Sequence, residues 1–242
     1  MVVAAPRFDK VQALAERIGG HAVRCDATKE DDVKALAKAA LGGYGRVDMA
    51  VNAAGMTLGG SASIADITDA DLLASFQLNY FGNVYFVRQM AEAIGKNGSI
   101  VLFSTMSATH PIAGIFGYAS AKAATDCLVR YAALEYGPRN ISINAVQPGL
   151  IWSELAAPLF SAPGVEPVLS KEIPLGRLGR PEEAAEAVLW MCGPSYISGL
   201  TIPIAGGQQL NRYPFPSEYP GGEAAMDNAT EVQKKRYEEL NG

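Results

Sequence analysis

Short apolar runs alternate with longer amphipathic segments along most of this chain of 242 residues. Short apolar runs are typical of strands buried in a parallel sheet, whereas apolar positions three and four residues apart are typical of helices. The predicted strands are residues 2–5, 21–25, 47–51, 99–103, 141–146 and 201–204. The predicted helices are residues 8–18, 29–41, 69–93 and 117–137, with another starting at Pro181. This alternation predicts an α/β fold, a doubly wound parallel sheet flanked by helices.

Polar and small residues follow several of these strands at their carboxyl ends. Asp26 follows the second strand, residues 52–55 (Asn-Ala-Ala-Gly) follow the third, and a hydroxyl cluster at residues 104–107 (Ser-Thr-Met-Ser) follows the fourth. The carboxyl ends of parallel strands share one edge of the sheet, where open α/β folds bind ligands. The sequence therefore predicts a ligand site at this edge.

Tyr118 and Lys122 lie four residues apart in the predicted helix 117–137, so their side chains share one face. A cation beside a phenol favours the phenolate and lowers its pKa, so the pair could donate and accept a proton near neutral pH. A Tyr and a Lys at this spacing also occur by chance in a chain of this length. The pair therefore indicates a catalytic site only in combination with the other polar motifs of the chain.

The order and spacing of these motifs resemble those of the short-chain dehydrogenase/reductase family, over about residues 2–210. Besides Tyr118 and Lys122, the matching positions include Asn79, the residues after the third and fourth strands, Pro148-Gly149, and the run from Ile173 to Glu183. The resemblance implies a nicotinamide-dependent oxidoreductase with a Rossmann-type fold. It also implies a homodimer or homotetramer, with helices 69–93 and 117–137 at a two-fold interface.

The resemblance implies a catalytic role for four residues. Tyr118 would be the general acid/base, and Lys122 would lower the Tyr118 pKa and hold the nicotinamide ribose. Asn79 would support the water of a proton relay. The family's catalytic serine falls at Thr105, which keeps a hydroxyl to polarise the substrate carbonyl but adds a methyl group. Two neighbouring hydroxyls could share that role: Ser104 and Ser107.

Cofactor contacts follow from the same resemblance. NAD-preferring members place an acidic residue after the first visible strand, whereas an Arg nearby accommodates the 2′-phosphate of NADP. Here Arg7 follows that strand and no carboxylate does, which favours NADP over NAD, although Arg7 could equally be a solvated residue at the start of a helix. Asp26 would meet the adenine amino group. The remaining implied contacts are Asn52, Ala53 and Gly55 on the adenosine side, Lys122 at the ribose, and Pro148, Gly149 and Ser153 near the nicotinamide.

The start of the chain departs from the family pattern. Family members begin with a strand, a Gly-rich turn and a helix whose amino terminus holds the cofactor pyrophosphate, and this chain opens at what would be the second strand. A strand removed from the middle of a sheet leaves its neighbours about 9.5 Å apart and unpaired. Two expectations follow: the natural chain starts upstream of Met1, or the flanking strands have closed up and the pyrophosphate site is lost.

The composition of the chain argues against several classes of function. The formal net charge of −5 and the absence of a basic stripe argue against nucleic-acid binding. No apolar stretch is long enough to span a membrane and no signal peptide is evident, so the expected location is the cytoplasm. The three cysteines are widely spaced and only two histidines accompany them, which argues against a metal site.

We expect one domain over residues 1–210, followed by an extension over residues 211–242.

The resemblance predicts reversible hydride transfer between NAD(P) and a secondary alcohol or ketone. Residues 152–172 are apolar and interrupted by proline, and they would determine which substrate binds. They suggest a lid over a small hydrophobic substrate, although a packing or interface role is also open. The aromatic residues of the extension could cap the same cleft, pack on a neighbouring subunit, or be solvated. Two other functions remain open: a cofactor-free scaffold that kept the fold, and a non-redox isomerase or dehydratase that uses Tyr118.

Overall fold

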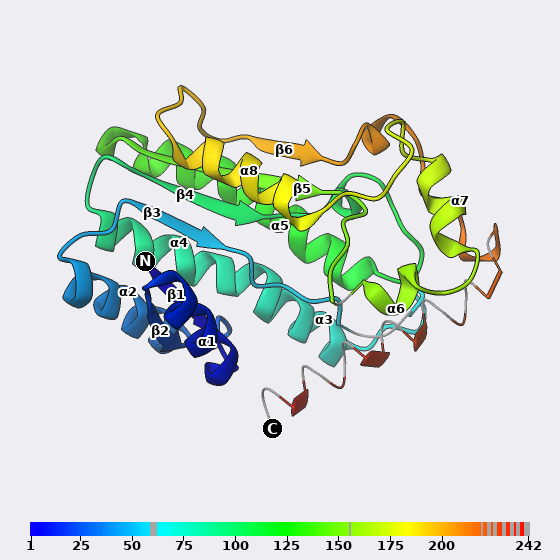
Figure 1. Cartoon of the computed structure of the whole chain (residues 1–242), viewed down its shortest axis with the longest axis horizontal. Coiled ribbons are helices and arrows are strands. Elements are labelled where there is room, and N and C mark those ends of the chain that lie inside the picture. The colour runs from blue at the N-terminus through cyan, green and yellow to red at the C-terminus, as the bar shows by residue number, and fades with distance from the viewer. Residues whose placement is uncertain are drawn as a thin grey trace.

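A four-stranded parallel sheet in the order β3–β4–β5–β6 forms the centre of the computed structural model (Figure 1). Its strands are β3 (Met49–Asn52), β4 (Gly98–Phe103), β5 (Ile141–Pro148) and β6 (Thr201–Ile204). A separate parallel pair is formed by β1 (Val2–Ala5) and β2 (His21–Arg24). The structure describes residues 1–58, 62–154 and 156–218, together with positions 220, 221, 224, 227, 228, 231, 232, 235, 238 and 239. The extension beyond residue 218 thus falls largely outside the described residues.

Helices cover both faces of the sheet, which confirms the predicted α/β fold with a parallel sheet. The longer helices are α1 (Phe8–Ile18), α2 (Glu30–Tyr44), α3 (Asp69–Phe76), α4 (Gly82–Ile94), α5 (Phe116–Tyr136) and α8 (Pro181–Cys192). Two short helices, α6 (Ala157–Phe160) and α7 (Val165–Lys171), lie between β5 and α8. Helix α2 runs three residues beyond the predicted end at Leu41, because the left-handed residue that stops it is Gly45 (φ 72°).

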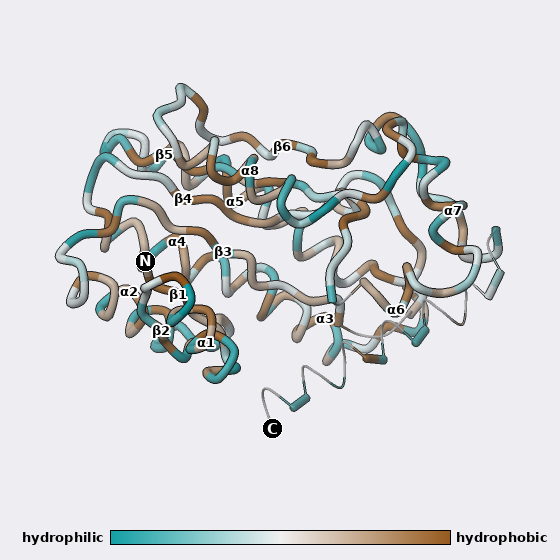
Figure 2. The backbone as a smooth tube through the Cα atoms, in the orientation of Figure 1, coloured by the Kyte–Doolittle hydropathy of each residue, from teal (hydrophilic) through white to brown (hydrophobic). Residues whose placement is uncertain are grey.

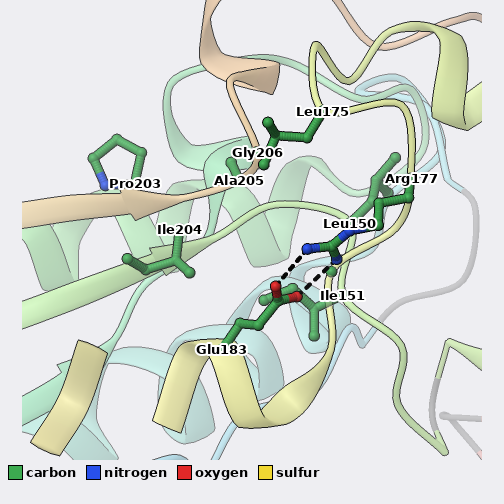
Figure 3. A pocket seen from close by; sticks show the side chains of 10 residues that line it. Leu150, Ile151, Leu175, Arg177, Glu183, Pro203, Ile204, Ala205 and Gly206 are labelled. Carbon is green, nitrogen blue, oxygen red and sulfur yellow. Dashed lines mark hydrogen bonds and ion pairs between the residues drawn. The ribbon is translucent and has the colours of Figure 1, made fainter. Parts of the chain in front are cut away.

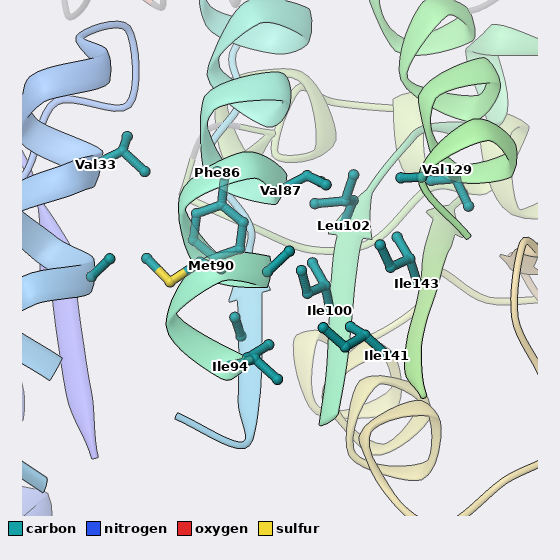
Figure 4. Close-up of a cluster of buried hydrophobic side chains, with 14 of the residues drawn as sticks. Val33, Phe86, Val87, Met90, Ile94, Ile100, Leu102, Val129, Ile141 and Ile143 are labelled. Carbon is teal, nitrogen blue, oxygen red and sulfur yellow. The ribbon is translucent and has the colours of Figure 1, made fainter. Parts of the chain in front are cut away.

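The main core lies between the sheet and the layer formed by α4 and α5 (Figure 4). Val87 and Ile94 of α4 lie beside Leu102 and Ile100 of β4, whereas Met90 points toward α2 (Figure 4). In Figure 2 much of β4 has the hydrophobic colour. On the opposite face α8 packs against β4 and β5 through a smaller buried cluster: Val101, Val146, Val188, Met191 and Cys192. A strand that is buried on both faces needs a nearly continuous apolar sequence, as in residues 100–103.

The pair β1–β2 joins the rest of the molecule through α2, not through a strand ladder. Cys25 and Val33 belong to the same core as α4, and Arg88 pairs with Glu30 at 2.6 Å. Among the described residues no ladder joins β1 to β3, so these two strands have not closed up. The two faces of β3 differ in burial: Ala50 is buried, whereas Met49 is 56% exposed.

The long helix predicted over residues 69–93 is interrupted by one π-helical turn, η1 (Gln77–Phe81). Thr68 starts α3 as expected, since its hydroxyl accepts a hydrogen bond from the Asp71 amide at 3.1 Å. The π turn inserts extra backbone between α3 and α4 and contains Asn79, which is completely buried. Single π turns inside helices are frequent at functional sites.

Candidate active site

Lys122 and Tyr118 project from α5 toward the carboxyl end of β4. The Lys122 ammonium donates a hydrogen bond to the Phe103 carbonyl at 2.7 Å and lies 5.9 Å from the centre of the Tyr118 ring. Lys122 is only 2% exposed. Tyr118 and Lys122 therefore share one face of α5, as predicted, and the hydrogen bond to the end of β4 fixes the position of the ammonium.

The pKa values of these two groups are shifted mainly by burial. Burial lowers the pKa of Lys122 to about 8, with the Asp126 carboxylate partly opposing that shift. Burial raises the pKa of the Tyr118 phenol, and a hydrogen bond with Thr105 acts in the opposite direction. The expectation that Lys122 lowers the Tyr118 pKa is not met in this structure, because the ammonium is turned to the Phe103 carbonyl and desolvation dominates at the phenol.

The hydroxyl cluster after β4 lies beside Tyr118. Thr105 lies close enough to Tyr118 to oppose the rise in its pKa, and the Thr105 Oγ1 lies 3.1 Å from the Ser107 Oγ. The Thr105 Oγ1 also accepts a hydrogen bond from the Ser107 amide at 3.3 Å, which starts the 3₁₀ turn η2 (Met106–Ala108). Ser104 is buried, and its hydroxyl oxygen has no hydrogen-bond partner among the described residues. Of the three hydroxyls, that of Thr105 is the one that influences the Tyr118 phenol.

Asn79 holds the loop after β3 in place. Its Nδ2 donates to the Met56 carbonyl at 2.9 Å, and its Oδ1 accepts from the Met56 amide at 3.1 Å. Gly55 lies between the Asn79 side chain and the Lys122 ammonium: a Cβ atom at Gly55 would sit 3.0 Å from the Asn79 Oδ1 and 2.9 Å from the Lys122 Nζ. Glycine therefore lets the loop backbone lie close to this ammonium, and we call this close approach the Gly55 cradle.

A buried polar network beneath this loop was not found from the sequence. Asn52 donates to the Asn83 Oδ1 at 2.8 Å, and Asn83 donates to the Asn79 carbonyl at 2.8 Å. Thr125 of α5 donates to the same carbonyl at 2.8 Å. Polar residues at apolar positions of two amphipathic segments, Asn83 and Thr125, were the signal that could have revealed it, because buried polar groups need partners.

Asp26 stands at the end of β2, where the adenine contact was predicted. Its Oδ1 accepts from the Thr28 amide at 2.9 Å and from the Thr28 hydroxyl at 2.7 Å. Its Oδ2 is buried and has no hydrogen-bond partner among the described residues, although the Lys29 ammonium lies 3.5 Å away. An acceptor without a hydrogen-bond donor is compatible with an amino group of a ligand.

Fewer interactions fix the side chains of the other residues that were predicted to contact the cofactor. Arg7 precedes α1 and forms no ion pair with any described residue. Ala53 is exposed after β3. Gly149, which follows Pro148, is explained by packing, since a Cβ there would lie 2.8 Å from the Ala205 Cβ. Ser153 is exposed, and its hydroxyl accepts from the Ala156 amide at 3.1 Å. Among the described residues, no hydrogen bond joins Pro148, Gly149 or Ser153 to Tyr118.

A cavity at the carboxyl ends of β5 and β6 is separate from the catalytic side chains (Figure 3). Its two charged residues bind each other, since Arg177 donates to both carboxylate oxygens of Glu183 at 2.6 and 2.9 Å. This pairing, with the Arg180 amide, lowers the pKa of Glu183 to about 2. Because these charges satisfy each other, the cavity offers no unpaired charge to a ligand.

Within the part of the chain that the structure describes, no group of three or more His, Cys, Asp or Glu side chains gathers in an arrangement that could hold a metal ion. Across the same residues, no helix combines the length and apolar character that a bilayer crossing demands.

The chain is similar to several oxidoreductases. A family model described as enoyl-(acyl carrier protein) reductase matches residues 2–209. The 7alpha-hydroxysteroid dehydrogenase of Escherichia coli strain K12 is 35% identical over 204 residues, which cover 81% of this chain and 78% of that protein. The 2,5-dichloro-2,5-cyclohexadiene-1,4-diol dehydrogenase of Sphingobium indicum is 31% identical over 210 residues, 81% of each chain. A solved short-chain type dehydrogenase/reductase from Mycobacterium ulcerans is 25% identical, with a TM-score of 0.83 over 90% of this chain and 83% of that one.

Proposed function

The chain belongs to the short-chain dehydrogenase/reductase family. Its relatives are oxidoreductases that act on CH–OH groups. On this basis we propose the following roles for the residues of this chain. Tyr118 acts as general acid/base in the interconversion of a secondary alcohol and a ketone. The observation that carries this proposal is the grouping of the buried Lys122 with Tyr118 and Thr105, which are half-buried: the Lys122 ammonium lies 5.9 Å from the centre of the Tyr118 ring, and Thr105 is close enough to influence the phenol.

In the reducing direction, Thr105 donates a hydrogen bond to the substrate carbonyl and Tyr118 delivers a proton to the same oxygen as negative charge builds there. In the oxidising direction, Tyr118 takes the alcohol proton. Lys122 stays cationic below its pKa of about 8, so near neutral pH its charge favours the alkoxide that forms on the substrate. Asn79 keeps the loop after β3 in the shape that brings the Gly55 backbone close to this ammonium.

Members of this family use NAD(P), and the nicotinamide supplies or accepts the hydride when it is bound. Three features of this chain fit such a group. The Asp26 Oδ2 lacks a hydrogen-bond donor, Gly55 lets backbone lie close to the site, and the Lys122 ammonium lies beside Gly55. Arg7 carries no ion pair with a described residue, which supports NADP over NAD through a 2′-phosphate.

We propose a hydrophobic substrate that enters under residues 152–172. The described part of this segment packs on itself: the Trp152 and Phe160 rings meet edge to face at 5.3 Å, and Phe160, Val165 and Leu169 form a small apolar cluster. Two relatives are named for a hydroxysteroid and a cyclohexadiene diol, so cyclic secondary alcohols are the first compounds to test.

We propose that the protein assembles as a homodimer or homotetramer. Tyr131 and Leu134 of α5 are 62% and 75% exposed, and Leu73 of α3 is 69% exposed, which supports the predicted two-fold interface. The cytoplasm stays the predicted location.

The test of this function is binding and turnover by the purified 242-residue chain. We expect NADPH to bind more tightly than NADH in a fluorescence titration, and cyclic alcohols to be oxidised with formation of NADPH. Tyr118→Phe should keep nucleotide binding and lower kcat by at least about 100-fold. Conversion of substrate without nucleotide turnover would favour a non-redox enzyme instead. Failure of the folded chain to bind either nucleotide would favour the scaffold function.

A further inference from the structure

Asp126 is a buried carboxylate for which the proposed reaction has no role. It lies on α5, and only 9% of its surface is exposed. Its Oδ1 accepts a hydrogen bond from the Thr201 hydroxyl of β6 at 3.2 Å. Burying a carboxylate costs free energy unless hydrogen bonds and a positive charge compensate it. One neutral hydroxyl supplies only part of that compensation, so a cation should lie nearby.

Lys122 supplies this cation from the same helix. It precedes Asp126 by four residues within α5 and is 2% exposed. Side chains four residues apart in a helix are neighbours on one face, with their Cβ atoms about 5–6 Å apart. Tyr118 and Arg130 continue this row at the same spacing. The row therefore places a phenol, an ammonium, a carboxylate and a guanidinium in that order along α5.

Few other charges lie close to this pair. The strands next to α5, β4 to β6, contain no charged residue. The charged and phenolic side chains of α3, η1 and α4, which pack on α5, are exposed or engaged elsewhere. Asp69 is exposed, Asp71 accepts from the Thr68 hydroxyl, Arg88 pairs with Glu30, Glu92 pairs with Arg139, and the Tyr80 and Tyr85 rings contact that of Phe81.

The pKa values of the two groups agree with this geometry. Burial lowers the pKa of Lys122 to about 8, and the Asp126 carboxylate opposes that shift. Burial raises the pKa of Asp126, and the Thr201 hydrogen bond and the charges of Arg130 and Lys122 oppose that rise. The ammonium itself is hydrogen-bonded to the Phe103 carbonyl, so the carboxylate acts on it through space. Such an attraction is stronger in a buried site than in water.

We propose that Asp126 is a positioning residue whose carboxylate keeps the buried Lys122 ammonium charged and at the end of β4. A buried ammonium that loses its counter-charge either gives up its proton or moves toward water. Both changes would weaken the stabilisation of the substrate alkoxide. The consequence for catalysis rests on the proposed function, whereas the effect on the charge of Lys122 does not.

The first measurement is the titration of Lys122 in the nucleotide-free chain, followed by NMR of the lysine Cε atoms. The signal that Lys122→Met lacks belongs to Lys122, and its midpoint in the wild-type protein should lie at about pH 8. Asp126→Asn removes the charge and keeps an oxygen for the Thr201 hydroxyl, so the midpoint should fall by about one pH unit. The matched control is Thr201→Val, which removes the hydrogen bond but keeps the carboxylate, and its midpoint should stay at the wild-type value.

The second measurement is the pH dependence of kcat/KM with NADP and a cyclic secondary alcohol. A midpoint lowered by one unit leaves Lys122 almost fully charged at pH 6 but mostly neutral at pH 8. The ratio of kcat/KM in Asp126→Asn to that in the wild-type protein should therefore fall about fivefold between these pH values. A merely structural defect would lower kcat/KM by the same factor at every pH.

The outcomes separate this inference from the proposed function. An unchanged Lys122 midpoint in Asp126→Asn, an equal fall in Thr201→Val, or a kcat/KM ratio that does not depend on pH would overturn it. A midpoint that depends on Asp126, in a chain that oxidises no alcohol, would retain the assignment of Asp126 and refute the redox function. Thermal unfolding checks that each variant is folded, and Asp126→Ser is the neutral variant to use if Asp126→Asn is not.

Discussion

Replacing Lys122 by Met should change how the stability of the nucleotide-free protein depends on pH. Lys122 is 2% exposed, and burial lowers its pKa from 10.5 to about 8. In the unfolded chain the ammonium is hydrated and its pKa returns to the ordinary value. Between these two values the unfolded chain holds a proton that the folded chain has lost, so raising the pH favours the folded state.

The size of the effect follows from the shift. One pKa unit corresponds to about 1.4 kcal/mol, so burying this ammonium costs roughly 3 kcal/mol below the folded pKa of about 8. The cost vanishes as the pH rises through 10.5, the unfolded value. Between pH 7 and 9.5 the Lys122 contribution to the free energy of unfolding should increase by about 2 kcal/mol. The Met variant has no group to titrate there and should lack this increase.

The assay is urea unfolding, followed by circular dichroism, at pH values from 7 to 9.5. The quantity of interest is the free energy of unfolding of the wild-type protein minus that of Lys122→Met, because other groups that titrate at alkaline pH are common to both proteins. Lys38→Met, at an exposed position of α2, is the control and should give a profile parallel to that of the wild type. Parallel profiles for Lys122→Met as well would refute the reasoning, since they would show that burial does not shift this group.

Three further substitutions test the site and its surroundings. Gly55→Ala should weaken NADPH binding about tenfold in a fluorescence titration, because the new methyl group would lie 2.9 Å from the Lys122 Nζ; unchanged affinity would mean that the cradle holds no ligand. Arg7→Ala should weaken NADPH binding about tenfold and leave NADH binding unchanged, and an equal loss for both would contradict a 2′-phosphate contact. His110→Leu removes the hydrogen bond to the Gln209 carbonyl and should speed hydrogen exchange in residues 208–215 without affecting β4, whereas unchanged exchange would show that this bond does not hold the segment.

The sheet and its covering helices could be predicted because their physical causes are local. A strand buried on both faces needs an apolar run, and β4 and β5 both supply one. Tyr118 and Lys122 could be paired because four residues of helix bring two side chains to the same face. The end of α2 was misplaced because Gly42 and Gly43 are tolerated inside a helix, and the choice of Gly45 as the stop depends on the chain that follows.

The parts that could not be predicted depend on contacts between distant residues. The π turn at Asn79 leaves the amphipathic pattern almost unchanged, so periodicity does not reveal it. The hydrogen bond between the His110 Nε2 and the Gln209 carbonyl joins positions 99 residues apart, and no local pattern encodes such a contact. The sequence predicted a lowered pKa for Tyr118, whereas burial raises it. Spacing along a helix shows that two groups are near each other, but not how much water the fold removes from each of them.

The burial of Lys122 links the stability of the site to its chemistry. Buried groups with a strongly shifted pKa are frequent at functional sites, and here the Lys122 ammonium stands beside the Gly55 backbone and 5.9 Å from the centre of the Tyr118 ring. The hydrogen bond from Lys122 to the Phe103 carbonyl fixes the ammonium at the end of β4, directly before the loop that carries Thr105. Because one strand end positions both the cation and the hydroxyl, a shift of β4 would displace both groups together relative to Tyr118 on α5. The distance between β4 and α5, set by the buried side chains between them, therefore determines the geometry of the proposed proton transfer.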